Sequence, residues 1–185
     1  MQLANIKDVN FIVLHGESDV GKTTTLNELI ISLSDDRKNV GKIEVVSGCR
    51  FCNKSVLSNN EGLKKHLNCK NKYQRKKNKE YDHIYSFEYR EKSVLVITEG
   101  DNMFKLLYTL VYNFLLHNKI DIVVCAAREK FLKVFVEHLS TKLGVNNNNI
   151  DIDKELQKGK NKNDDTDMAK KILKKIDNLI KKSGN

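Results

Sequence analysis

Residues 11–25 constrain the fold of this chain more than any other stretch. Residues 11–14 are four consecutive apolar residues, which is typical of a parallel strand buried on both faces. A glycine-containing loop follows at 16–23, and apolar residues then recur from Leu26 to Leu33 at helical spacing. The stretch therefore predicts a buried strand, a tight loop and a helix that begins near Gly21.

The residue types of this loop suit a polyphosphate ligand. Gly16 and Gly21 allow the backbone to wrap around phosphate oxygens with its N–H groups pointing inward. The positive end of the following helix dipole lies at the same place. Lys22 is placed to reach the outer phosphates, and the Thr23 hydroxyl to ligate Mg²⁺.

The spacing Gly-Xaa4-Gly-Lys-Thr resembles the Walker A motif of the P-loop NTPase superfamily. This resemblance implies binding of a nucleotide by the whole loop and the first helical turn. Two acids lie inside the loop, and we expect these variable positions to point outward. The nucleotide-binding residues are expected to be Gly16, Glu17, Ser18, Asp19, Val20, Gly21, Lys22, Thr23 and Thr24.

Strand and helix patterns alternate along the rest of the chain, which predicts a single α/β domain over residues 1–185. We expect a three-layer α/β/α sandwich of the P-loop NTPase type, with a mostly parallel sheet and one antiparallel edge strand at 84–89. The other expected strands are 42–47, 93–98, 120–127 and 150–152. The expected helices are 21–34, about 104–115, 128–143 and 167–182, and polar loops are expected at 146–149 and 158–165.

The last helix has a basic face opposite its apolar stripe. That face suits an anionic surface, but the ordinary width of the apolar stripe favours docking on the protein core.

Acidic residues follow the apolar strand expected at 93–98. A P-loop enzyme needs an acid at the end of a neighbouring strand to hold Mg²⁺ through water. Asp101 is the expected magnesium residue and Glu99 the residue that orients water or a substrate hydroxyl. The alternative for Asp101 is a purely structural role as the N-cap of the next helix.

Arg128 ends the strand expected at 120–127. An arginine there can stabilise charge on a γ-phosphate in the transition state. The alternative is a surface residue that opens a helix.

The sequence 118–121, Asn-Lys-Ile-Asp, matches the guanine-recognition motif of Ras-like GTPases. It precedes a predicted strand instead of following one, which places it at the wrong edge of the sheet. We therefore expect ATP, and not GTP, as the nucleotide.

Residues 48–82 lack periodicity and are read as a basic insertion in the domain. Cys49, Cys52, His66 and Cys69 form two short pairs with the spacing of a tetrahedral zinc site. Ordinary free cysteines and a surface histidine are the alternative. A basic run with two tyrosines follows, which suits a phosphorylated acceptor or a nucleic-acid strand, or else a solvated loop.

The formal net charge of +9 favours polyanionic partners such as nucleotides or nucleic acid, although a lysine-rich solvated surface gives the same value. Four cysteines among 185 residues do not resemble a secreted disulfide framework. The sequence contains no apolar run long enough for a bilayer and no signal-peptide pattern. A cytoplasmic protein without a membrane partner is therefore expected.

Three functions remain open from the sequence. Nucleoside triphosphate hydrolysis is expected first, with Lys22, Glu99, Asp101 and Arg128 as catalytic residues. A small P-loop kinase is the second, with residues 48–82 in the place where adenylate-kinase-like proteins carry the acceptor module. A nucleic-acid-binding module is the third. The core strands look similar to small P-loop ATP-binding proteins of bacterial mobile elements and phages, a resemblance that defines no reaction.

Overall fold

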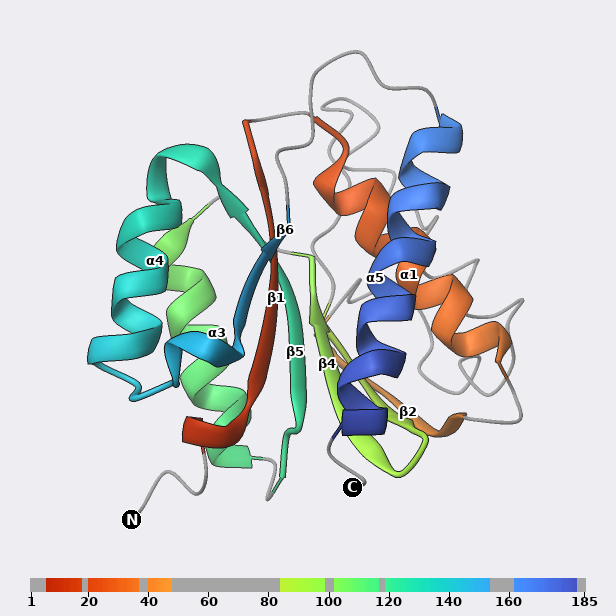
Figure 1. The fold of residues 1–185 in the computed structure, drawn as a ribbon, viewed down its shortest axis with the longest axis horizontal. Coiled ribbons are helices and arrows are strands. Elements are labelled where there is room, and N and C mark those ends of the chain that lie inside the picture. Colours follow the sequence, from red (N-terminus) through yellow and green to blue (C-terminus); the bar gives the residue numbers. More distant parts are fainter. Residues whose placement is uncertain are drawn as a thin grey trace.

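The computed structural model describes residues 6–17, 20–36, 40–47, 84–98, 102–116, 119–153 and 162–182. These residues form an α/β structure in which a six-stranded sheet lies between two pairs of helices (Figure 1). The strands are β1 (Asn10–Gly16), β2 (Val40–Ser47), β3 (Ile84–Tyr89), β4 (Lys92–Ile97), β5 (Ile122–Arg128) and β6 (Ile150–Asp153). The helices are α1 (Lys22–Asp35), α3 (Met103–Leu116), α4 (Glu129–Thr141) and α5 (Lys162–Lys182).

The strand order across the sheet is β2-β3-β4-β5-β1-β6. Pairing is parallel between β4 and β5, β5 and β1, and β1 and β6, whereas β3 is antiparallel to both of its neighbours. Five strands therefore run in one direction, and their carboxyl ends share one edge of the sheet, the carboxyl edge. Ligands of open α/β sheets bind along this kind of edge.

The expectation that residues 84–89 form an edge strand is wrong. β3 is antiparallel, as predicted, but it lies between β2 and β4. Tyr85, Phe87 and Tyr89 pack into the core on the side of α1 and α5, while Glu88 is exposed. Alternation of apolar and polar residues indicates that one face of a strand is covered. It does not indicate whether a further strand pairs alongside it.

Two hydrophobic cores fill the two sides of the sheet. Ile12 and Leu14 of β1 pack with α1 and α5, while Phe11 and Val13 pack with α3 and α4. All four side chains have no exposed surface, which explains why β1 is continuously apolar and not alternating. Helices on both faces thus hold the end of β1 in a fixed position.

Helix α5 begins earlier than the sequence pattern suggested. Residues 162–165 are helical, although they were expected to belong to a polar loop. The apolar side of α5, including Ala169, Ile172 and Ile176, packs in the core beside α1, so the expected docking of this helix on the core is confirmed. The early start of α5 brings its first turn to the beginning of α1.

Candidate functional site

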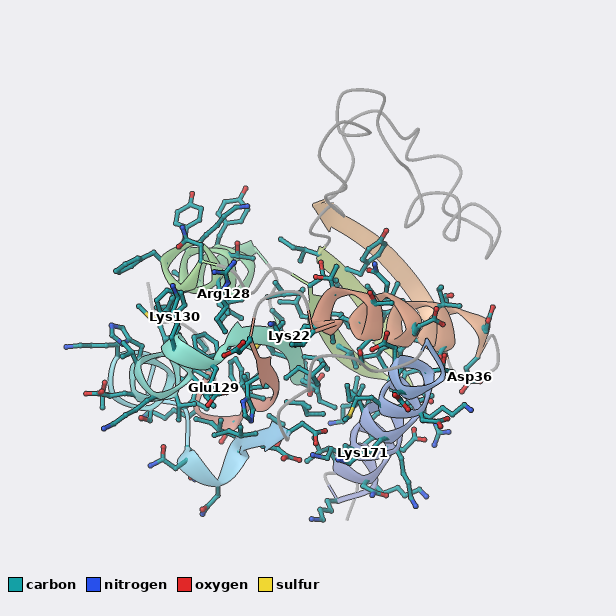
Figure 2. The ribbon with its side chains drawn as sticks, turned by 90° about the horizontal axis from the view of Figure 1, so that it is seen from above. Lys22, Asp36, Arg128, Glu129, Lys130 and Lys171 are labelled. Carbon is teal, nitrogen blue, oxygen red and sulfur yellow. The ribbon has the colours of Figure 1, made fainter. Side chains whose placement is uncertain are left out.

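The loop between β1 and α1 lies at the carboxyl edge, near the middle of the molecule (Figure 2). Gly16 ends β1 with φ 151°, and Gly21 precedes α1 with φ 91°. Both values lie in the region that glycine adopts more readily than other residues. Glu17 is exposed and Val20 is buried, while Ser18 and Asp19 lie outside the described residues. The predicted strand, loop and helix are therefore all present in the predicted order.

Lys22 is the first residue of α1 and turns back over the loop. It is buried, with 7% of its surface exposed. Its Nζ donates to the Gly16 carbonyl oxygen at 2.9 Å and also to the Glu17 carbonyl oxygen. The ammonium group is therefore held over the turn at the end of β1, where an anion bound by the loop would meet it.

The first turn of α1 carries the remaining loop residues. Gly21 is the N-cap and has no side chain to accept a hydrogen bond from the first amide groups. The helix has no acidic residue of its own in this turn, and the acidic side chain beside the positive end of its dipole is that of Asp165 from α5. Thr23 and Thr24 are partly buried there. Amides and an ammonium group suit phosphate oxygens, and a threonine hydroxyl oxygen is a possible ligand of Mg²⁺.

Asp165 of α5 is a residue of this region that the sequence did not indicate. Thr25 Oγ1 donates to Asp165 Oδ1 at 2.9 Å, and Asp165 is buried. A Cβ atom placed on Gly21 would lie 2.8 Å from the same oxygen. The two partners are 140 residues apart, and no local pattern marks such a contact. Asp165 thus fixes the start of α1 against the last helix and leaves room only for glycine at position 21.

Arg128 lies at the end of β5, where its backbone pairs in register with Gly16. The prediction that Arg128 ends a strand is confirmed, and Arg128 also immediately precedes α4. Figure 2 shows its side chain toward α3, away from α1. The alternative, a residue that opens a helix, is also correct because Arg128 is the N-cap of α4.

A second pair of residues that the sequence did not indicate joins β1 to α4. His15 precedes Gly16, and its Nδ1 contacts Glu129 Oε2 at the first residue of α4. His15 is only slightly exposed, whereas Glu129 faces solvent on one side. This contact ties the start of the loop to the helix that follows the neighbouring strand.

The acids expected to hold Mg²⁺ follow β4, which is not a direct neighbour of β1. β5 lies between them, so the two strands are about 10 Å apart given a spacing of about 4.8 Å per strand. The expectation that these acids follow a strand adjacent to β1 is therefore wrong. Glu99 and Asp101 themselves lie outside the described residues. The capping role weighed for Asp101 belongs to Asn102, whose Oδ1 accepts from the Lys105 amide at 3.2 Å.

Asp121, the last residue of the motif that resembles a guanine-recognition sequence, lies at the opposite edge. It precedes β5, accepts from the Ser93 amide at 2.8 Å and forms ion pairs with Lys92 and Lys119, both at 3.6 Å. These contacts tie the amino ends of β4 and β5 together. The position confirms the prediction that this motif lies away from the loop.

The predicted zinc ligands Cys49, Cys52, His66 and Cys69 lie outside the described residues, as does the whole insertion 48–82. Among the described residues, no group of three or more His, Cys, Asp or Glu residues is arranged to hold a metal ion. The remaining cysteine, Cys125, is buried in β5, and burial raises its pKa to about 12. Cys125 therefore belongs to the core as a neutral thiol.

None of the helices within the described ranges has both the length and the apolar character needed to cross a bilayer. Comparisons with protein-family models, with curated proteins and with solved structures found no match to this chain.

Proposed function

We propose that this protein binds ATP and Mg²⁺ at the loop 16–24 and hydrolyses the nucleotide. The observation that carries the proposal is the buried ammonium of Lys22, held over the loop at the junction of β1 and α1. An ammonium group in this position suits the negative charge of a triphosphate, and the loop amides and the start of α1 add further donors to it.

Individual residues have distinct roles in this proposal. Lys22 and the backbone amides neutralise the outer phosphates, and the Thr23 hydroxyl ligates Mg²⁺. The bound cation supplies charge neutralisation for phosphoryl transfer. Arg128 ends β5, the strand adjacent to β1. In this proposal its side chain changes rotamer and approaches the γ-phosphate. Glu99 and Asp101 keep their proposed roles at the end of β4.

Turnover of γ-labelled ATP with Mg²⁺ tests the reaction. We expect release of inorganic phosphate by the wild-type protein and its loss, by at least about a hundredfold, in Lys22→Ala. Lys170→Ala is the matched control because Lys170 is an exposed lysine of α5. Equal turnover by wild type and Lys22→Ala would contradict the assignment of the site.

The same assay separates hydrolysis from phosphoryl transfer. Nucleotides, nucleosides and single-stranded nucleic acid are added as a mixed pool, and label is followed on each of them. Label on an acceptor would establish the kinase that the sequence left open, and free phosphate alone establishes the hydrolase.

Bound zinc is tested by a separate experiment. Metal analysis of protein purified without chelators should give one equivalent of zinc if residues 49–69 hold it.

A further inference from the structure

Helix α3 exposes a row of aromatic side chains. Phe104, Tyr108 and Tyr112 are 75%, 70% and 47% exposed. They are spaced four residues apart, which places them on one face of the helix. Single exposed apolar residues are common, but a row of three large rings on one helix indicates an interaction surface. We call these three residues the aromatic stripe.

The large apolar side chains described on α3 differ in exposure between aromatic and aliphatic residues. Leu106 and Leu110 are fully buried against the sheet, whereas the exposed large apolar side chains described on α3 are the three aromatic rings. Tyr108 and Tyr112 have ring centroids 6.1 Å apart and planes inclined by only 14°. Nearly parallel, exposed rings offer flat faces on which the bases of a nucleic acid can stack. Aliphatic side chains at the same positions would not provide such faces.

Cationic side chains lie near the aromatic stripe, with Glu129 of α4 as an acidic neighbour of Arg128 and Lys130. Lys105 is exposed between Phe104 and Tyr108, and α3 contains no aspartate or glutamate. Lys130, in the first turn of α4, lies 4.7 Å above the Phe131 ring, and Figure 2 shows Arg128 and Lys130 on the α3 side of the carboxyl edge. A polyanion with exposed bases complements this combination of rings and cations.

We propose that the aromatic stripe and Lys105 form a binding surface for single-stranded nucleic acid. Bases stack on the rings without strong sequence preference, and Lys105 with the cations of the first turn of α4 contacts the phosphates. The surface begins at the carboxyl edge, beside the loop that we propose for ATP, but it requires no nucleotide. Its test can therefore fail or succeed independently of the ATP proposal.

The test measures fluorescence anisotropy of a labelled oligothymidylate of about 15 nucleotides with the full chain at low salt and without ATP. We expect the double variant Tyr108→Ala/Tyr112→Ala to lose at least about tenfold in affinity. The double variant Tyr108→Phe/Tyr112→Phe keeps both rings and should bind within about twofold of wild type. Ile152→Ala, at an exposed apolar position of β6, is the control for general loss of apolar surface.

A salt series tests the role of Lys105. Lys105→Gln should weaken binding and reduce the slope of log affinity against log salt concentration by about one phosphate contact. Lys119→Gln removes an exposed lysine before β5, at the opposite edge, and should leave the slope unchanged.

Any of three results would overturn the proposal, the first two of which concern affinity for the oligonucleotide. The first is wild-type affinity in the Tyr108→Ala/Tyr112→Ala variant, and the second is no binding by the wild-type protein at low salt. The third is self-association in sedimentation experiments that this variant abolishes, without binding of the oligonucleotide, because the stripe would then be covered by a second copy of the chain. The variants change exposed side chains, and circular dichroism verifies that they fold.

Discussion

Lys22 and Gly21 show how single residues define the candidate site. Lys22 keeps its ammonium group in a position with little solvent, where the carbonyl oxygens of Gly16 and Glu17 replace part of its hydration. Gly21 combines a positive φ with close contact to Asp165. Lys22 carries the phosphate binding that we propose, and Gly21 is the residue type that fits beside Asp165.

Gly21→Ala should destabilise the fold for two reasons. Its φ of 91° is costly for alanine, by about 1–2 kcal/mol, and its new Cβ would lie 2.8 Å from Asp165 Oδ1. Gly144→Ala is the matched control, because its φ is 74° but its nearest neighbour is a flexible lysine carbon at 3.9 Å. Urea unfolding should show a larger loss of unfolding free energy for Gly21→Ala than for Gly144→Ala.

A double-mutant cycle isolates the contact with Asp165. In the Asp165→Ala background the steric part of the Gly21→Ala penalty should disappear, leaving only the φ strain. An identical penalty in both backgrounds would show that α5 does not contact the loop in solution.

At the scale of elements, ion pairs attach strand β6 to helix α5. Asp153 ends β6 with 2% of its surface exposed and contacts Lys171 at 2.8 Å and Lys175 at 3.1 Å. Burial alone would raise the pKa of Asp153, but hydrogen bonds from Lys171 and Lys175 outweigh it and lower the pKa below its ordinary value of 3.8. Lys175 also reaches Asp151 at 2.8 Å. These ion pairs hold α5, and with it Asp165, in place.

Asp153→Asn should therefore reduce stability in a pH-dependent way. A lowered pKa in the folded state means that the carboxylate stabilises the fold above its unfolded pKa, and that this contribution is lost as the pH falls through the folded value. We expect a loss on the order of 2 kcal/mol at pH 7, less than for fully buried pairs because the two lysines are partly solvated. The difference from wild type should shrink as the pH falls below about 4.

Asp167→Asn is the control for this experiment, since Asp167 forms an exposed ion pair with Lys170 within α5. Chemical denaturation between pH 3 and pH 7 should give nearly the same curve for Asp167→Asn as for wild type. A difference between wild type and Asp153→Asn that stays constant with pH would contradict the linkage.

Local patterns predicted the elements well, and long-range contacts account for what they missed. The strand, loop and helix around Lys22 follow from one continuous stretch, so spacing alone identifies them. The hairpin of β3 and β4 is also local, but the pairing of β2 outside β3 is not, and β3 was therefore placed at the edge. Glu129 and Asp165 reach the loop from 114 and 140 residues away. These contacts depend on which strands and helices lie side by side, and no periodicity of the sequence specifies that arrangement.

At the scale of the whole molecule, one edge of the sheet gathers the groups that can bind anions. The loop after β1, Arg128 after β5 and the first turns of α3 and α4 all lie at the carboxyl edge (Figures 1 and 2). The opposite edge carries structural contacts such as those of Asp121. The carboxyl edge also carries structural contacts, such as those of Asp153 at the end of β6, and it is the kind of edge at which open α/β sheets bind ligands.

Calorimetric titration of ATP with Mg²⁺ into the wild-type protein, Lys22→Ala and Lys170→Ala tests the central claim most directly. The account predicts that wild type and Lys170→Ala bind one equivalent with the same affinity. Lys22→Ala should bind at least about tenfold more weakly, because a charge-assisted hydrogen bond to phosphate is lost. Equal affinity of all three proteins, or no binding by the wild-type protein, would contradict it.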